Sequence, residues 1–373
     1  MFKNVFYQKK VLITGNTGFK GSWLSTWLLS LNAEVYGYSD KIPTKPSLYE
    51  ACELDKKITQ KYADIRDYRE VKNTIENIQP DYIFHLAAQP LVYTSYLDPL
   101  ETISTNVLGT SNVLEALREV NPDCIAIIIT SDKCYDNVEW VWGYKETDAL
   151  GGKDVYSGSK GAAEMITKSY FHSFFKDMSQ NRVRVASVRA GNVIGGGDWA
   201  DFRIIPDCIR AWINGNSVEI RSPKATRPWQ HVLEPLSGYL SLAVQLGDNV
   251  ELNGETFNFG PDAEYSTTVE TLLNDMSKYW KLKQSPSFVS KKESKFHEAS
   301  LLKLNCDKAL FYLNWLPTLD YEHLIKYTAT WYYNYYYAES DMFDQTLEQI
   351  REYETIATGK GIKWTYSLIC SSV

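Results

Sequence analysis

The stretch VLITGNTGFKGSWL, residues 11–24, places three glycines between a short apolar run and a helical pattern. We interpret residues 11–13 as a buried strand and residues 22–31 as the helix that follows it. Glycines at this spacing permit a tight turn and let the N–H groups of a helix N-terminus approach a pyrophosphate. The stretch predicts a dinucleotide-binding loop rather than a merely structural turn. Its glycines are Gly15, Gly18 and Gly21.

The rest of the first half repeats this alternation of short apolar runs and longer helical patterns. Further strands are expected at residues 34–38, 82–84, 124–130 and 183–188. Further helices are expected at residues 101–120 and 155–175. Strands separated by helices of this length indicate the α/β class, with a parallel sheet covered on both faces. The expected architecture is a doubly wound, Rossmann-type sheet.

The second half has a less regular pattern, with glycine- and proline-rich loops. Short strands are expected at residues 217–221 and 256–259, among short helices. The aromatic-rich helical region 318–357 is expected to pack against the body or a neighbouring subunit rather than hold a cofactor. The expected domains are a dinucleotide-binding domain over 1–190, a smaller substrate-binding α/β lobe over 191–357 with some chain crossing back, and an uninterpreted tail over 358–373.

The composition is that of an ordinary globular protein and argues against several classes of partner. The chain has 373 residues and a net charge of −7 without a basic stripe, so nucleic acid is not an expected partner. It has no apolar run of about 18 residues, so no membrane association is expected. Six cysteines without a Cys-x-x-Cys motif predict free thiols in a reducing cytoplasm. Five histidines without a His-x-x-x-His pair predict no metal site.

An acidic residue follows the second expected strand, where dinucleotide-binding folds hold the adenosine ribose. Asp40 lies 19 residues after Gly21, and a carboxylate there disfavours a 2′-phosphate. This favours NAD over NADP, although the neighbouring Lys41 argues the other way. The predicted NAD-binding residues are Gly15, Thr17, Gly18, Phe19, Lys20, Gly21, Asp40, Asp64, Ile65, Leu86, Ala87, Ala88, Gln89, Thr105, Tyr156 and Lys160.

A tyrosine and a lysine in VYSGSKGAAE, residues 155–164, are spaced for redox chemistry. Tyr156 and Lys160 are four residues apart, so on a helix their side chains share one face. A nearby ammonium and a positive nicotinamide ring would both favour the phenolate, whose ordinary pKa is about 10. Tyr156 is therefore expected to act as the base that takes a proton from a sugar hydroxyl. The alternative is that Lys160 only extends along its helix to solvent.

The order of the glycine loop and the Tyr-x-x-x-Lys motif resembles the extended short-chain dehydrogenase/reductase family, which acts mostly on nucleotide sugars. Seven stretches between about residue 8 and about residue 355 are most similar to the branch that dehydrates CDP-glucose. They are GNTGFKGSWL, HLAAQPLV, TNVLGT, TSDKCYDN, EWVWGY, VRAGNVIGGGDW and RPWQHVLEPLSGYL. The resemblance implies an NAD-dependent lyase that forms a deoxysugar precursor of bacterial surface polysaccharides such as O-antigen, in a cytoplasmic homodimer or dimer of dimers.

In TSDKCYDN, residues 130–137, the resemblance implies that Asp132 and Lys133 are the acid/base pair of a 4,6-elimination. A 4-epimerase or a simple reductase would need only a hydroxyl near the sugar 4-OH, from Thr130 or Ser131, together with the tyrosine. Such an enzyme is the first alternative, and an NAD-binding sensor without turnover is the second. The predicted catalytic residues are Thr130, Ser131, Asp132, Lys133, Tyr156 and Lys160.

The substrate-binding residues follow the sixth expected strand, and most are implied by the resemblance. Guanidinium groups suit a diphosphate. His231 is either a structural histidine or a substrate contact. This chain departs from the family at Tyr93, where an arginine is usual, and at Val155, where a proline is usual. The predicted substrate-binding residues are Asn192, Arg203, Ile205, Arg221, Arg227 and His231.

Overall fold

A computed structural model describes residues 1–220, 222–261, 267–280, 288–290 and 301–366 of the chain. Its centre is a seven-stranded sheet in which all neighbouring strands are parallel, in the order β11-β6-β5-β4-β1-β2-β3. The strand order without β11 is that of a doubly wound dinucleotide-binding fold, as the sequence predicted. The strands are β1 Lys10–Thr14, β2 Glu34–Ser39, β3 Thr59–Tyr62, β4 Tyr82–His85, β5 Ile125–Ile129, β6 Arg184–Ala190 and β11 Thr256–Phe259.

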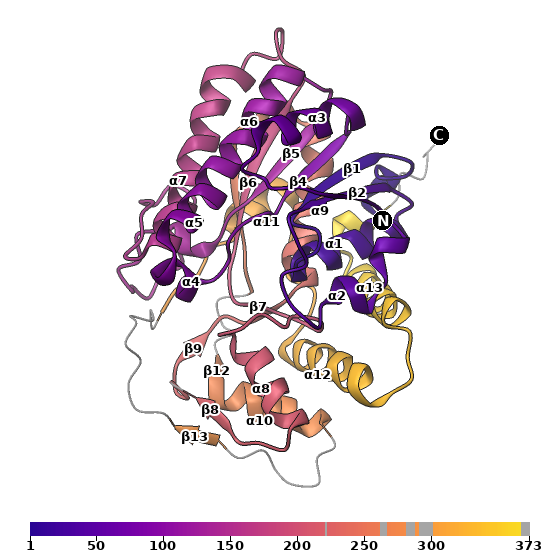
Figure 1. Ribbon diagram of the computed structural model, residues 1–373, viewed down its shortest axis with the longest axis vertical. Helices are drawn as coiled ribbons and strands as arrows, with labels where there is room; N and C mark the ends of the chain where they lie inside the picture. The colour runs from indigo at the N-terminus through magenta and orange to yellow at the C-terminus, as the bar shows by residue number, and fades with distance from the viewer. Residues whose placement is uncertain (221, 262–266, 281–287, 291–300, 367–373) are drawn as a thin grey trace.

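Helices cover both faces of the sheet (Figure 1). One face carries α3 Tyr68–Ile78, α6 Gly109–Val120 and α7 Val155–Tyr170. The other carries α1 Phe19–Ser30, α9 Leu233–Asp248, α11 Asp307–Leu313 and α13 Met342–Gly359. In the central strands β1, β4 and β5, alternate residues enter the two apolar cores, as period-2 alternation requires. In β1, for example, Val11 and Ile13 belong to one core and Leu12 to the other.

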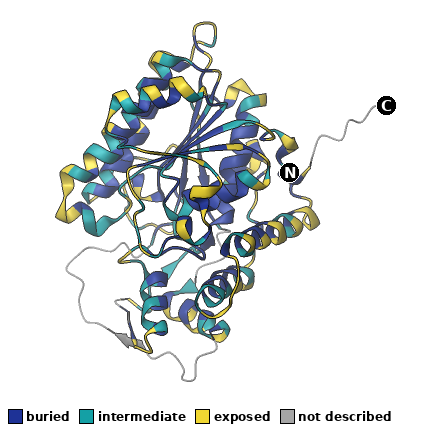
Figure 2. Ribbon diagram, turned by 45° about the vertical axis from the view of Figure 1, so that its right-hand side comes forward, coloured by how far each residue is buried: buried dark blue, intermediate teal, exposed yellow. Residues whose placement is uncertain are grey.

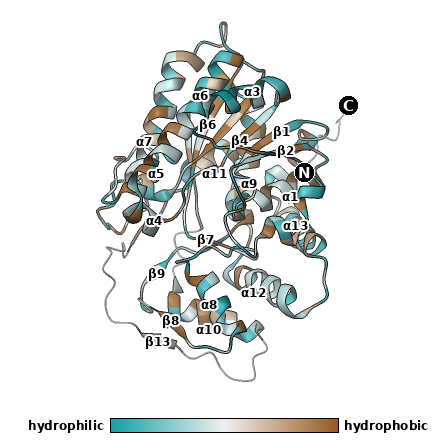
Figure 3. Ribbon diagram, viewed as in Figure 1, coloured by the Kyte–Doolittle hydropathy of each residue, from teal (hydrophilic) through white to brown (hydrophobic). Residues whose placement is uncertain are grey.

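The sheet is mostly buried and apolar, apart from its polar and exposed edge strand β3, and the outer faces of its helices are exposed (Figures 2 and 3). The expected helix at 101–120 is three consecutive segments, α5 Pro99–Ile103, a π-helical turn Ser104–Leu108 and α6. A second π-helical turn, Phe171–Phe175, extends α7. A short helix, α4 Val92–Leu97, precedes α5, and α2 Leu48–Ala51 follows β2.

A smaller lobe lies below the carboxyl ends of the strands in Figure 1. It contains three helices and three two-stranded pairings, β7 with β10, β9 with β12, and β8 with β13. Its helices are α8 Ile204–Ile213, α10 Val269–Tyr279 and α12 Tyr321–Tyr337. Its strands are β7 Val193–Ile194, β8 Val218–Ile220, β9 Thr226–Arg227, β10 Gln230–His231, β12 Thr267–Thr268 and β13 Phe288–Ser290.

Within this region the chain crosses back to the larger body at β11. Residues 256–259 were expected in the smaller lobe, but β11 pairs with β6 as an edge strand of the main sheet. Together with α9, it returns the chain to the larger body. The segment from residue 358, which no pattern explained, extends α13 and then turns so that Trp364 stacks on Phe2 at 4.8 Å between ring centroids.

Most aromatic residues of α12 pack against the body of the protein, as predicted, whereas Tyr337 at its end is exposed. Trp331 and Tyr332 are fully buried, and Trp331 contacts Trp199 edge to face at 5.6 Å. The Tyr332 hydroxyl donates to the carbonyl of Asp198 at 2.5 Å, so this helix supports the loop that follows β7. Within the part of the chain described, no helix combines the length and apolar character that a membrane span needs.

Candidate active site

A cavity of about 980 Å³ opens at the carboxyl ends of the parallel strands, between the sheet and the smaller lobe. In open α/β folds this edge of the sheet is where ligands bind. The cavity wall contains the glycine loop, the ends of β4, β5 and β6, the start of α7 and the loop before α8. Residues predicted separately as cofactor, catalytic and substrate groups therefore share one space.

The three loop glycines are required for different reasons. Gly15 has a φ of +75°, and a Cβ there would stand 2.7 Å from the backbone N of Ala87. A Cβ on Gly21 would stand 2.3 Å from the carbonyl oxygen of Gly15. A Cβ on Gly18 would meet nothing closer than 3.4 Å, so this glycine leaves free space at the N-terminus of α1. Such a cradle beside free N–H groups fits a dinucleotide pyrophosphate.

The loop is anchored to β2, which brings the predicted ribose-binding residue to the cavity. The hydroxyl of Thr17 donates to the carbonyl of Lys41 at 2.7 Å, and the N–H of Gly15 donates to the carbonyl of Tyr38 at 2.8 Å. Asp40 lines the cavity and is half exposed, with the amine of Lys41 3.6 Å from its carboxylate. Its carboxylate is therefore accessible to ribose hydroxyls.

Asp64 and Ile65 also line the cavity, but the Asp64 carboxylate is already engaged. It accepts hydrogen bonds from Nε of Arg66 at 2.9 Å and from its NH2 at 2.5 Å, and these bonds lower the pKa of Asp64. The Asp64 carboxylate is therefore occupied within its own turn, and Ile65 beside it is 5% exposed.

The residues after β4 line the cavity as a tightly bonded turn. The N–H of Ala87 donates to the hydroxyl of Thr14 at 3.2 Å, and the Gln89 side chain is bonded to Leu91 and Thr102. The Gln89 side chain thus has a structural role in its own turn. The remaining predicted members of this wall are Leu86, Ala88 and Thr105.

Tyr156 and Lys160 lie on the first turns of α7, both buried at the cavity wall. Burial raises the pKa of Tyr156 to about 12, against a smaller lowering by hydrogen bonding to Ser131. Burial lowers the pKa of Lys160 to about 8. The protein alone therefore does not bring the pKa of the phenol near neutral, and the expectation that Tyr156 acts as a base depends on the positive nicotinamide ring. Desolvation outweighs the Ser131 hydrogen bond and the nearby charge of Arg203, and the positive nicotinamide ring would have to supply the difference.

The two hydroxyls after β5 have different surroundings. The Thr130 hydroxyl donates to the Glu164 carboxylate, and its oxygen lies 3.0 Å from the carbonyl oxygen of Val188. The Ser131 hydroxyl donates to Oδ1 of Asp132 at 2.9 Å. Its hydrogen bonding also lowers the pKa of the Tyr156 phenol. Of the two candidates for a hydroxyl partner of Tyr156, the geometry favours Ser131.

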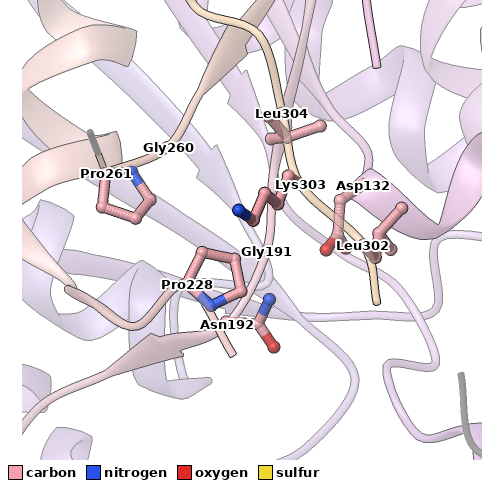
Figure 4. A pocket seen from close by; sticks show the side chains of 9 residues that line it. All are labelled: Asp132, Gly191, Asn192, Pro228, Gly260, Pro261, Leu302, Lys303 and Leu304. Carbon is pink, nitrogen blue, oxygen red and sulfur yellow. The ribbon is translucent and has the colours of Figure 1, made fainter. Parts of the chain in front are cut away.

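The predicted acid/base pair divides between a buried and an exposed group. Asp132 is 4% exposed and packs against Gly191, while Lys133 is exposed on the cavity wall. The Lys133 amine is therefore accessible from the cavity. Figure 4 shows Asp132 beside a small pocket whose wall includes Gly191 and the side chain of Lys303. With about 10 Å³ of space, this pocket fits a single water molecule.

The smaller lobe brings four of the six predicted substrate-binding residues to the cavity, and they are Asn192, Arg203, Ile205 and Arg227. Arg221 lies outside the described residues. His231 is only 1% exposed and lies edge to face with the rings of Trp23 and Tyr327. It does not line the cavity, so the structural alternative for this histidine is the one that the fold supports.

Three features of the site were missed by the sequence analysis. Asp198 accepts a hydrogen bond from NH1 of Arg203 at 2.8 Å and so orients this guanidinium. Lys20, assigned only to the cofactor, has a pKa lowered to about 8 by burial and by the nearby Arg203. Glu164 lies four residues after Lys160 on the same face of α7, a helical spacing that could have indicated it.

Comparison with known proteins gave a family and close relatives. Residues 12–328 match the family model described as GDP-mannose 4,6 dehydratase. The chain is 45% identical over 358 residues to a CDP-glucose 4,6-dehydratase of Salmonella typhimurium, covering 95% of this chain and 99% of the relative.

Solved structures share the fold. An epimerase from Methanothermobacter thermautotrophicus superposes with a TM-score of 0.75 at 22% identity, covering 94% of this chain and 96% of its own. A dTDP-glucose 4,6-dehydratase double mutant from Streptomyces venezuelae with NAD bound has a TM-score of 0.74 at 20% identity, covering 87% of this chain and 97% of its own.

Proposed function

The chain belongs to the GDP-mannose 4,6 dehydratase family, and we propose that it is an NAD-dependent CDP-glucose 4,6-dehydratase, a hydro-lyase. The observation that carries the proposal is the meeting of two chemical pairs in one cavity. Tyr156 and Lys160 suffice for oxidation of a sugar hydroxyl, whereas Asp132 and Lys133 add a second acid/base pair. An epimerase or a reductase has no use for that second pair. The choice of CDP-glucose follows the 45% identical relative.

The glycine loop and the ends of β2 and β4 hold NAD in this proposal. The space at Gly18 receives the pyrophosphate, and the accessible carboxylate of Asp40 receives the ribose hydroxyls. When bound, NAD accepts the hydride from C4 of the sugar and later returns it to C6. Lys160, buried beside this space, supplies an ammonium below a pH of about 8.

The protein side chains move the protons. Tyr156 takes the proton of the sugar 4-hydroxyl. Hydrogen bonding by Ser131 favours this step because it lowers the pKa of the phenol. The resulting ketone acidifies the proton on C5, which one member of the Asp132–Lys133 pair removes. The other member protonates the C6 hydroxyl, which leaves as water. A proton then returns to C5. Because neighbouring titratable groups are coupled, we assign both proton transfers to the Asp132–Lys133 pair as a whole.

The substrate lies against the smaller lobe. Arg203, oriented by Asp198, and Arg227 offer guanidinium groups for the diphosphate, with Asn192 beside them. Ile205 at the start of α8 offers an apolar contact for the nucleotide.

One incubation tests the proposal. The protein is mixed with CDP-glucose and NAD in deuterated water, and the sugar is followed by NMR. A 4-keto-6-deoxy product carrying deuterium at C5 is the expected result. A 4-epimer would instead identify an epimerase, and unchanged CDP-glucose with bound NAD would identify a sensor.

We further infer a homodimer, or a dimer of dimers, in the cytoplasm. Helices α5 and α7 and the turns that continue them expose large apolar side chains, as a helix–helix interface between subunits requires. These residues are Leu100, Ile103, Leu108, Met165 and Phe174. The five described cysteines are free thiols, consistent with a reducing compartment. Sedimentation as a monomer would contradict the dimer. The product would serve deoxysugar synthesis for surface polysaccharides such as O-antigen.

A further inference from the structure

A buried ion pair lies beside the turn of residues 131–134, which carries Asp132 and Lys133. Glu164 of α7 and Arg189 of β6 are each 3% exposed, with Nε of Arg189 3.1 Å from Oε1 and its NH2 3.0 Å from Oε2 of the carboxylate. Ser187, two residues before Arg189 on the same face of β6, donates to Oε2 at 2.8 Å. The hydroxyl of Thr130 donates to Oε1. Both carboxylate oxygens therefore have partners on two neighbouring strands.

The same ion pair contacts both ends of the turn that carries the acid/base residues. Thr130, immediately before the turn, is bonded to Glu164. Tyr135 immediately follows the turn. The guanidinium carbon of Arg189 lies over the Tyr135 ring, 4.6 Å from the ring centroid. The Tyr135 hydroxyl also donates to Oδ1 of Asn258 at 2.8 Å, which ties this end to β11. The Glu164–Arg189 ion pair therefore contacts the residues at both ends of the turn.

Glu164 also belongs to the helix that carries the redox pair. Tyr156, Lys160 and Glu164 are spaced at four-residue intervals, so they lie on one face of α7. A single carboxylate therefore links the helix of the redox pair with the loop of the elimination pair.

We infer that Glu164, paired with Arg189, is a positioning residue that fixes the Ser131–Cys134 turn against the Tyr156–Lys160 face of α7. A buried ion pair contributes little net stability compared with apolar side chains of the same size, so a role in stability alone explains it poorly. A 4,6-dehydratase must present two pairs of groups to adjacent carbons of one sugar, and displacement by about 1 Å costs about 100-fold in rate. The inference rests on the proposed function for its chemistry, and its geometry is independent of that function.

The primary test is Glu164→Gln in the NAD-loaded protein, which keeps the shape of the side chain and removes its charge. We expect hydrogen–deuterium exchange of the peptide over residues 131–136 to rise about tenfold, because the turn loses its anchor. We expect kcat for dehydration to fall about 10- to 100-fold with an unchanged KM. The matched control is Glu234→Gln, a second buried carboxylate that lies on α9 and does not line the cavity. It should leave the exchange of this peptide unchanged.

The pH profile separates positioning from simple loss of stability. The Glu164 carboxylate favours the charged form of Lys160 and so opposes the lowering of its pKa by burial. Removing this negative charge should lower the pKa of Lys160 further. The alkaline limb of kcat/KM should therefore move to lower pH in Glu164→Gln and stay in place in Glu234→Gln.

A second variant covers the case in which Glu164→Gln does not fold. Thr130→Val removes only the hydroxyl that Glu164 holds, and Thr167→Val makes the same change at a buried position of α7 whose hydroxyl donates to Ala163 of its own helix. Faster exchange of residues 131–136 is expected for Thr130→Val alone. Unchanged exchange in Thr130→Val would overturn the inference. A wild-type protein that does not dehydrate CDP-glucose would count against the proposed function instead, since the exchange experiment needs no sugar.

Discussion

Both carboxylate oxygens of Asp132 lie against Gly191, where a Cβ would stand 1.8 Å from Oδ2 and 2.6 Å from Oδ1. The glycine at the end of β6 is therefore required by the side chain that it faces. Asp132 is held from the other side by the Ser131 hydroxyl at 2.9 Å. The acid/base carboxylate thus occupies a fitted position rather than a solvated turn.

Gly191→Ala should displace the Asp132 carboxylate and lower kcat for dehydration by about 100-fold, because about 1 Å of misplacement has that effect. NAD affinity should stay within twofold or so of wild type, since the glycine loop is untouched. The control is Gly158→Ala on α7, where a Cβ would meet nothing within 4 Å. Wild-type kcat in Gly191→Ala would mean that Asp132 is not needed at this position.

Lys133→Met should leave oxidation at C4 intact and slow the elimination by about 100-fold or more, the usual contribution of a general acid or base. Stopped-flow absorbance in a single turnover should then detect reduced nicotinamide that persists, whereas the wild type should return it rapidly. Lys326→Met, at an exposed position of α12, serves as the control. Normal turnover in Lys133→Met would mean that Lys133 is not part of the acid/base pair.

Affinity for NAD should fall as the pH rises from 7 to 9. Burial lowers the pKa of both Lys20 and Lys160 to about 8, so both lose their positive charge within this range. A pyrophosphate attracts only the charged forms, and each lysine should contribute up to about tenfold per pH unit. Calorimetric titration at several pH values measures the slope. Lys20→Met should flatten it, and an identical slope in this variant would exclude a contact between Lys20 and the cofactor.

The sequence indicated the parts of the site that depend on local spacing. The glycine loop and the Tyr156–Lys160 pair are set by turns and helical periodicity within a few residues, so both could be recognised without a structure. The position of β11 could not, because a four-residue strand pattern carries no information about which sheet it joins. The high pKa of Tyr156 was missed for a related reason, since desolvation depends on packing by segments distant in the chain.

The contact made by Tyr93, which stands where an arginine is usual, could not be predicted from the sequence either. Its ring stacks on Phe202 at 4.1 Å between centroids, with 29° between the planes, and so joins α4 to the loop that carries Arg203. Phe202 has a φ of +62°, a strained conformation for a side chain of this size. Only the folded chain brings these two residues together. The aromatic replacement of the usual arginine therefore has a partner that the sequence did not reveal.

Tyr93→Ala should release the loop of Arg203 and raise KM for CDP-glucose by about 3- to 10-fold, the equivalent of one aromatic pair. Tyr93→Phe keeps the ring and should keep a KM near that of the wild type. NAD affinity should not change in either variant. Steady-state kinetics at saturating NAD make the comparison. A KM that rises equally in both variants would assign the effect to the hydroxyl instead of the stack.

Glu234→Gln should change how stability depends on pH. Glu234 is buried, accepts the N–H groups of Thr318 and Leu319, and has a pKa raised by burial from 4.5 to about 7. Between these two values the folded chain holds a proton that the unfolded chain has released, so the stability that Glu234 contributes is fully present below pH 4.5 and is lost as the pH rises to 7. The difference corresponds to about 3 kcal/mol in the free energy of unfolding. A glutamine can still accept from the two N–H groups and has no such titration. Urea denaturation of both proteins at a fixed concentration, from pH 4.5 to 7.5, should show the wild type losing stability relative to the variant. Parallel pH curves would mean that Glu234 stays ionised in the core.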